Sequence, residues 1–278
     1  MIRLLAIDID GTLLDGRGRL PDAHRDALVD AAARGLEIVL VTGRTFHFSH
    51  PIALALPIPL TLVVNNGALV QDRDGVTRMR HLLARDVAAI VLQGTRAYEE
   101  SVAIVFDRSD DRQIVFERMD WSHPHRRGYY ERNRQFIAEV SPLAATLTED
   151  PIQVMFNGYV APMRALVAVL RALPSAERFS VSVTEYERRD FSLVDVNGAG
   201  CSKGATLTRW VESRGLTSEE VFAAGDNLND VDMLQYAGTA VIMGNASDAV
   251  RARLPHAHVT LSNDEDGLAL AIRTMAFS

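Results

Sequence analysis

Cysteine is almost absent from this sequence, and long apolar runs are missing. Cys201 is the single cysteine in 278 residues, which excludes an intramolecular disulfide and a zinc site built on several cysteines. No apolar segment approaches the roughly 20 residues that a membrane-spanning helix needs. The apolar stretch at the N-terminus is too short for the core of a signal peptide. We therefore expect a protein of the cytoplasm.

Positive charge is also in short supply. The sequence has 29 Lys and Arg against 36 Asp and Glu, a net charge of −7. An acidic chain repels nucleic acids and anionic membranes unless its basic residues gather in one place. The densest basic run, residues 123–127, is too short for such a surface, and we interpret it as a solvated loop. The composition argues against nucleic-acid and membrane partners and leaves the oligomeric state open.

Strand and helix signals alternate at both ends of the chain. Pro21 begins a helical stretch that Gly35 ends. Short apolar runs predict buried strands at residues 4–9, 36–41, 61–64, 191–196, 221–224 and 239–243. Further helical stretches are found at residues 203–213 and 264–275. This alternation indicates a parallel α/β sheet with right-handed crossovers.

The middle of the chain has another pattern. Strand signals at residues 102–106 and 113–116 flank a short polar turn, which favours an antiparallel hairpin. Further strands at 152–156 and 180–183 enclose a helix at 164–173. We therefore expect an α/β fold whose doubly wound parallel-sheet (Rossmann-like) core comprises residues 1–82 and 191–278. An inserted α+β cap domain would comprise residues 83–190.

Two carboxylates, Asp8 and Asp10, follow the first predicted strand. Ligands bind at this edge of open parallel sheets, and residues two apart on an extended chain point to the same side. Neighbouring carboxylates repel unless a cation or a shared proton relieves them, and Mg²⁺ prefers such oxygen ligands. Gly11 lets the chain leave the strand sharply. The alternative is an acidic turn without function, since Asp and Gly are common in turns.

A hydroxyl and a cation follow other predicted strands. Thr42, Gly43 and Arg44 precede a helical stretch, and a helix N-terminus suits a phosphate group. Alternatively, Thr42 is an N-cap. Lys203 begins a helix, where its ammonium group could neutralise a transferring phosphoryl group. Taken alone, Lys203 is better interpreted as a surface lysine.

Asp226 and Asp230 bring two more carboxylates to a strand end. They follow the apolar run 221–224, and Asp226 is interpreted as a metal ligand. Asp230 would pair with Lys203 or help to hold the metal. The alternative is that these residues cap the following helix.

Together these motifs resemble those of the haloacid dehalogenase-like hydrolase superfamily. The matching motifs, which run through the core from Asp8 to Gly267, are Asp8-x-Asp10-Gly-Thr, Thr42-Gly-Arg44, Lys203-Gly204 and Gly225-Asp226-Asn227-x-Asn229-Asp230. Other features resemble the Cof-type phosphatase branch of this superfamily. They are the inserted cap, which starts late in the chain, and the segments Asn66-Gly67-Ala68, Met243-Gly244-Asn245-Ala246 and Asp266-Gly267. The cap matches in position and size without a residue signature, and Asn197 stands where a proline is expected.

The resemblance implies a Mg²⁺-dependent phosphatase that hydrolyses small phosphate monoesters, such as sugar phosphates or phosphorylated cofactors. Asp8 would attack phosphorus and form an aspartyl-phosphate. Asp10 would protonate the leaving oxygen and then deprotonate the attacking water. Asp8, Asp226 and the backbone carbonyl of Asp10 would bind Mg²⁺.

The resemblance also implies roles for the remaining residues. Thr42, within the Thr42–Gly43 turn, and Lys203 would hold the phosphoryl oxygens, and Asn229 would add an amide donor. Arg44 would either bridge phosphate and leaving group or pair with a core carboxylate. Asn66 is a further candidate for substrate binding. Asp230 would orient Lys203 or the waters of the metal.

Two other functions fit the same motifs. A phosphomutase uses the same aspartyl-phosphate but returns the phosphoryl group to a sugar. A phosphoryl-accepting regulatory module would use Asp8 as a switch, although such modules lack an acid placed like Asp10 and need no cap of this size.

Two histidine pairs are weaker candidates for metal ligands. The pairs are His47 with His50 and His123 with His125. Neither comes with a third ligand at a suitable spacing, so we interpret all four as surface histidines.

Overall fold

The computed structural model describes residues 1–277, except for the side chain of Arg132. The described chain divides into two compact units. The first unit contains Met1–Arg80 and the chain from Ser202 onward, and the second contains His81–Cys201. Among the described helices, none combines the length and the hydrophobicity of a transmembrane span.

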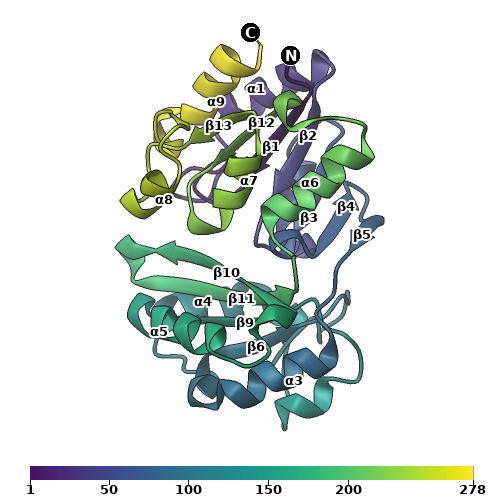
Figure 1. Cartoon of the computed structure of the whole chain (residues 1–278), viewed down its shortest axis with the longest axis vertical. Coiled ribbons are helices and arrows are strands. Elements are labelled where there is room, and N and C mark those ends of the chain that lie inside the picture. Colours follow the sequence, from purple (N-terminus) through teal and green to yellow (C-terminus); the bar gives the residue numbers. More distant parts are fainter. Residues whose placement is uncertain (278) are drawn as a thin grey trace. The chain divides into compact units, whose positions relative to one another are not determined.

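Within the described residues, the first unit is built on an eight-stranded sheet of order β14-β13-β12-β1-β2-β3-β4-β5 (Figure 1). The strands from β14 to β3 are parallel, and β4 and β5 are antiparallel. The strands are β1 (Leu4–Asp8), β2 (Glu37–Val41), β3 (Thr61–Val64), β4 (Leu69–Asp72), β5 (Thr77–Arg80), β12 (Val221–Gly225), β13 (Thr239–Ile242) and β14 (His258–Val259).

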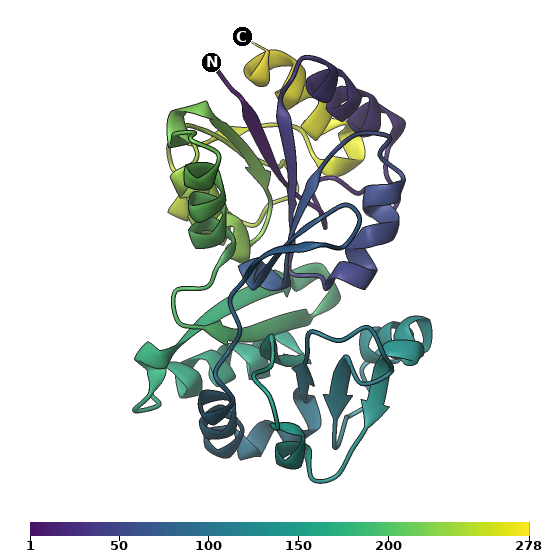
Figure 2. The ribbon, with the colours of Figure 1, turned by 90° about the vertical axis from the view of Figure 1, so that its right-hand side faces the viewer.

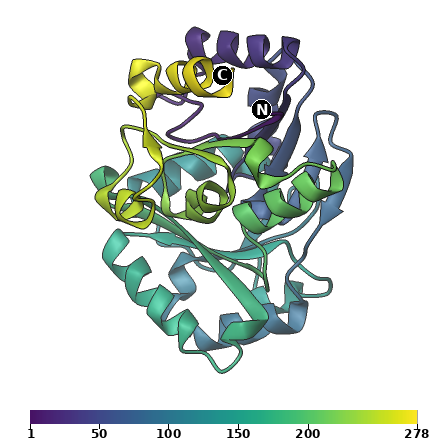
Figure 3. The ribbon, with the colours of Figure 1, turned by 45° about the horizontal axis from the view of Figure 1, so that its top comes forward.

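Helices cover both faces of this sheet, so its central strands are apolar on both sides. The helices are α1 (Asp22–Ala33), α2 (Phe46–Leu54), α6 (Lys203–Ser213), α7 (Val231–Tyr236), α8 (Asp248–Arg253) and α9 (Gly267–Ala271). Figure 2 shows α6 and α7 on one face and α1, α2 and α9 on the other; α1 and α9 lie side by side (Figure 3). Leu4 and Ala6 pack in one core cluster with Leu207 and Val211 of α6.

The strand order reverses between β1 and β12. From β1 the chain adds β2 and β3 on one side, and it later adds β13 and β14 beyond β12 on the other. In open α/β sheets ligands bind at the carboxyl ends of the strands that flank this switch point. Asp8 ends β1 and Asp226 follows β12, so the fold brings these two carboxylates to that position.

Within the described residues, the second unit has a six-stranded sheet of order β10-β11-β9-β6-β7-β8. Neighbouring strands are antiparallel except for β7 and β8. Helices α3 and α5 contribute to its core together with β6, β9 and β11. The elements are α3 (Arg85–Gly94), β6 (Val102–Val105), β7 (Ile114–Phe116), α4 (Pro124–Asn133), β8 (Ile137–Glu139), β9 (Gln153–Gly158), α5 (Val160–Arg171), β10 (Phe179–Tyr186) and β11 (Phe191–Gly198).

One strand was assigned to the wrong sheet. The apolar run at residues 191–196, which we expected to resume the core, is β11 and pairs antiparallel with β9 and β10 in the second unit. The second unit therefore extends to Cys201 instead of ending at residue 190. A short run buried on both faces has the same local pattern in a parallel and in an antiparallel sheet, so the run alone could not show its partners.

Smaller differences have local causes. The basic run 123–127 is not a solvated loop, because it starts α4 and the side chain of Arg126 is buried. His123 is likewise buried and is not a surface histidine. The last helix is interrupted at Asp266, whose φ of 56° ends the preceding turn before α9 begins. The antiparallel pair β4–β5 was not predicted.

Candidate active site

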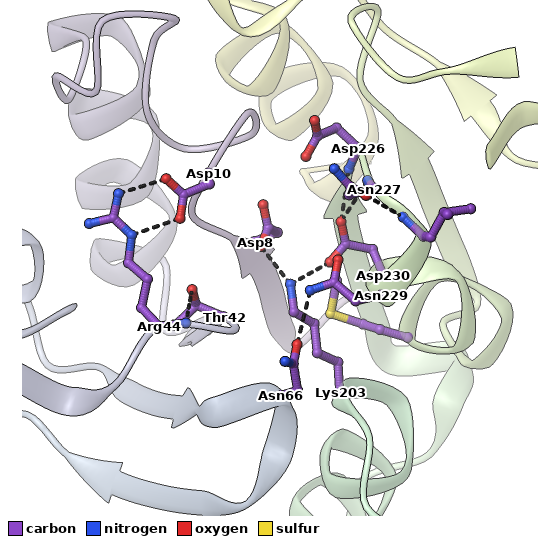
Figure 4. Close-up of polar contacts among 12 residues, drawn as sticks. Asp8, Asp10, Thr42, Arg44, Asn66, Lys203, Asp226, Asn227, Asn229 and Asp230 are labelled. Carbon is purple, nitrogen blue, oxygen red and sulfur yellow. Dashed lines mark hydrogen bonds and ion pairs between the residues drawn. The ribbon is translucent and has the colours of Figure 1, made fainter. Parts of the chain in front are cut away.

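Lys203 joins two carboxylates that come from different strands. It occupies the first turn of α6, which Ser202 caps by accepting a hydrogen bond from the backbone of Ala205. The Lys203 Nζ lies 2.6 Å from Asp8 Oδ1 and 2.6 Å from Asp230 Oδ1 (Figure 4). All three side chains are buried. Lys203 is therefore an internal counter-ion and not a surface lysine.

Asp230 is fixed by the turn that also carries Asp226. Its Oδ2 accepts hydrogen bonds from the backbone N–H groups of Asp226 at 3.0 Å and Asn227 at 2.9 Å. Its other oxygen accepts from Lys203. Both oxygens of Asp230 are therefore engaged, one with the lysine and one with the backbone of the turn.

One oxygen of Asp8 and one of Asp226 are left over. Asp8 Oδ2 and Asp226 Oδ1 are buried and have no hydrogen-bond partner among the described residues. Oxygens of Asp8, Asp226 and Asp230 lie within 4.8 Å of one another, the one such group of three or more potential metal ligands in the described chain. The histidine pairs are not part of it.

The charges of this group do not balance. Three carboxylates face one ammonium group, so two negative charges remain if all are ionised. Burial, followed by the charge of Asp230, raises the pKa of Asp8 to about 8 although Lys203 opposes the shift. Burial and the charge of Asp8 raise the pKa of Asp226 as well. A divalent cation bound to the two unpartnered oxygens would relieve this repulsion, so the residues fit Mg²⁺.

Asp10 has a different partner. Its carboxylate is held in a two-pronged ion pair by Arg44, with Nε 2.7 Å from Oδ2 and Nη2 2.6 Å from Oδ1. Both side chains are about one-third exposed. Figure 4 shows this pair beside the group formed by Asp8, Lys203 and Asp230. Of the two roles open to Arg44, the structure shows the pairing with a core carboxylate, and the carboxylate of Asp10 is not part of the metal-ligand group.

Thr42 lies immediately after β2 but does not cap a helix. The N-cap of α2 is Thr45, and the buried Thr42 Oγ1 accepts a hydrogen bond from the backbone N–H of Arg44 at 3.1 Å. Gly43 packs against the side chain of Asn66, which a Cβ on this glycine would approach to 3.2 Å. The Thr42–Gly43 turn is thus held by local contacts, and α2 begins after it at Phe46, so the alternative that Thr42 is an N-cap is wrong.

Asn66 and Asn229 meet across the sheet edge. Asn66 lies in a turn after β3 with a φ of 53°, and its Oδ1 accepts a hydrogen bond from Asn229 Nδ2 at 2.9 Å. The structure therefore brings every predicted site residue to one end of the first unit's sheet.

One residue beside the site had no predicted role: Asn245, which donates to Asp226 Oδ2 at 3.1 Å. It stood in a segment of the sequence that the resemblance had marked, but nothing local indicated its partner.

Comparisons with known proteins show the family of this chain. A profile of the haloacid dehalogenase-like hydrolase family matches residues 5–272. The chain is 31% identical over 257 residues to pyridoxal phosphate phosphatase YbhA of Escherichia coli K12, covering 90% of this chain and 91% of that protein. It is 29% identical to 5-amino-6-(5-phospho-D-ribitylamino)uracil phosphatase YcsE of Bacillus subtilis, covering 98% of this chain and 95% of the relative.

Solved structures show the same fold. The phosphatase BT1666 of Bacteroides thetaiotaomicron superposes with a TM-score of 0.81 at 25% identity, covering 100% of this chain and 96% of its own. A haloacid dehalogenase-like hydrolase of B. subtilis also gives a TM-score of 0.81, at 23% identity, with 99% and 100% coverage. The chain belongs to the haloacid dehalogenase-like hydrolases, as its motifs predicted, and it is a phosphatase of that family.

Proposed function

We propose that this phosphatase hydrolyses small phosphate monoesters in two steps, through a phosphoryl group held covalently on Asp8. The observation that carries the proposal is the environment of Asp8. One of its oxygens faces Lys203, while the other is buried without a partner among the described residues. A buried carboxylate with one oxygen beside an ammonium group and the other left for a cation is held in place for nucleophilic attack on phosphorus.

Lys203, Thr42 and the Thr42–Gly43 turn are proposed to receive the phosphoryl oxygens. The ammonium group of Lys203 supplies positive charge beside the nucleophile. The carboxylates of Asp230 and Asp8 raise the pKa of Lys203 against the lowering effect of burial, so the lysine stays charged at neutral pH. Fixed charge aimed at the transferring group stabilises the transition state without reorganisation.

Asp8 and Asp226, with the backbone carbonyl of Asp10, would hold Mg²⁺, as the two unpartnered oxygens of the carboxylate group suggest. When bound, the cation would neutralise charge on the phosphate and on both carboxylates.

Asp10 is proposed as the general acid and base. It would give a proton to the leaving oxygen in the first step and take one from water in the second. Arg44 holds its carboxylate at both oxygens, so Arg44 acts as a positioning residue.

The substrate is proposed to be a small phosphorylated metabolite. The relatives include phosphatases of pyridoxal phosphate, of a ribitylaminouracil phosphate and of HMP-PP. These compounds differ widely outside the phosphate group, so the shared core fits the phosphate they have in common.

Phosphate release from a panel of sugar phosphates and phosphorylated cofactors tests the proposal. Release should require Mg²⁺, stop with a chelator, and return poorly with Ca²⁺, whose larger and looser coordination misplaces the nucleophile. Asp226→Asn should raise the Mg²⁺ concentration that gives half-maximal phosphate release. Asp248→Asn, the same change at an exposed site on α8, should leave this concentration unchanged. Full turnover in metal-free buffer would contradict the metal-dependent mechanism, and isomer formation without phosphate release would indicate a mutase.

A further inference from the structure

Asn245 connects the two turns that carry the site. It follows β13 in the chain, and its Nδ2 donates to the carbonyl oxygen of Gly11 at 2.9 Å and to Asp226 Oδ2 at 3.1 Å. Its Oδ1 accepts from the backbone N–H of Asn263 at 3.1 Å. One side chain therefore links the turn after β1, the turn after β12 and the segment before α9.

The orientation of this amide is determined by its neighbours. The backbone N–H of Asn263 can only donate, so the amide oxygen of Asn245 must face it. The carbonyl of Gly11 and the carboxylate of Asp226 both accept, so the NH₂ group must face them. A flipped amide would set donor against donor and acceptor against acceptors, and Asn245 thus presents a fixed pair of donors.

These contacts decide which oxygen of Asp226 is left for a ligand. Asn245 occupies Oδ2, while Oδ1 is the oxygen that is buried without a partner among the described residues. Asp226 also lies tightly against the backbone of Gly11, where an added Cβ would come within 2.3 Å of Oδ2. The carboxylate is therefore packed against the turn after β1, and Asn245 bridges its Oδ2 to the carbonyl oxygen of Gly11.

The segment that holds Asn245 is itself tied to the same turn. Asn263 Nδ2 donates to the carbonyl oxygen of Leu14 at 2.7 Å. Asp264 Oδ1 accepts from the backbone N–H of Gly16 at 2.8 Å. Asn263 is buried. The segment that donates to the amide of Asn245 is therefore itself hydrogen-bonded to the chain that follows β1.

We infer that Asn245 is a positioning residue that aims Asp226 Oδ1 at the divalent cation and holds Asp226 at a set distance from the turn carrying Asp10. This inference rests on the proposed function, because it assumes that Asp226 binds Mg²⁺. Hydrogen-bonding partners of metal ligands typically contribute about 10- to 100-fold to metal affinity.

Mg²⁺ binding to the full chain, measured by calorimetry without substrate, tests the inference. Asn245→Ala, which removes the donor without adding charge, should raise the Mg²⁺ dissociation constant about 10- to 100-fold. Asn245→Asp also removes the donor, but its added negative charge attracts the cation, so the dissociation constant should rise less than in Asn245→Ala. Gln235→Glu, an amide-to-carboxylate change at an exposed site on α7, should bind like the wild type.

The thermal midpoint in metal-free buffer, measured for each variant, separates lost positioning from lost folding. A variant that stays folded and binds Mg²⁺ as tightly as the wild type would overturn the inference while leaving the proposed function intact. A wild-type chain that binds no Mg²⁺ at millimolar concentration would overturn the proposed metal site and, with it, the role of Asn245.

Discussion

At the residue scale, Asp8 and Asp10 are two residues apart but have different partners. Asp8 is buried beside Lys203, and burial, followed by the charge of Asp230, raises its pKa to about 8. Asp10 is partly exposed and held by Arg44. A buried carboxylate with a cation beside it suits attack on phosphorus, whereas an exposed one that can exchange protons suits acid–base work.

Asp10→Asn tests this division of roles. Without a base to activate water, the second step should slow more than the first, so kcat should fall about 100- to 10,000-fold. The phosphorylated enzyme should accumulate during turnover. Rapid-quench kinetics with a chromogenic phosphate ester measures both quantities. Asp26→Asn on the exposed face of α1 is the control, and a wild-type rate in Asp10→Asn would remove Asp10 from the mechanism.

At the element scale, α1 is attached to the turn after β1 by a buried histidine. His24 Nδ1 lies 2.9 Å from the carbonyl oxygen of Leu13, and Leu13 in turn donates its N–H to the carbonyl oxygen of Asp8. Burial lowers the pKa of His24 below its ordinary value near 6.5. The neutral ring, with its proton on Nδ1, is the form that fits this contact.

The stability of the first unit should therefore depend on pH through His24. As the pH falls, His24 takes up a proton in the unfolded chain before it does so in the folded chain. The contribution of His24 to the free energy of unfolding is therefore fully present above pH 6.5 and is lost below it. His24→Asn keeps a donor near Nδ1 but cannot be protonated, so it should lose less stability than the wild type between pH 7.5 and 5.5. Urea unfolding followed by Trp210 fluorescence, in a Trp121→Phe background, reports this unit. Equal losses in both proteins would contradict the assignment.

The elements that carry the site could be predicted from the sequence, but their long-range partners could not. The apolar runs of β1, β2, β3 and β12 are short and end in polar motifs, so the positions of Asp8, Thr42 and Asp226 followed directly. The assignment of residues 191–196 was wrong because pairing depends on strands far away in the sequence. The contacts of Arg44 with Asp10 and of Asn245 with Gly11 span 34 and 234 positions, and no local pattern encodes them.

At the scale of the whole molecule, the chemistry and the selection of substrate are proposed to reside in different units. Asp8, Asp10, Lys203 and the other site residues all belong to the first unit. The second unit, His81–Cys201, contributes none of them, yet it has its own core. We propose that its role is to discriminate between leaving groups.

Replacing residues 81–201 with the corresponding unit of a relative tests this separation. The ranking of kcat/KM over one panel of phosphate esters should change toward the ranking of the relative that supplied the replacement unit. Mg²⁺ dependence and phosphorylation of Asp8 should persist, since their residues are untouched. An unchanged ranking in a folded chimera would place selectivity in the first unit, with Arg44 and Asn66 as the first residues to vary.

The proposed mechanism requires the phosphoryl group to pass through Asp8. Acid quenching of Asp10→Asn enzyme during turnover with Mg²⁺, followed by peptide mass spectrometry, measures this directly. We expect one phosphoryl group on the peptide that contains Asp8, absent after chelation and absent in an Asp8→Asn/Asp10→Asn double variant. Turnover with no modified peptide, or with the phosphoryl group on another residue, would contradict it.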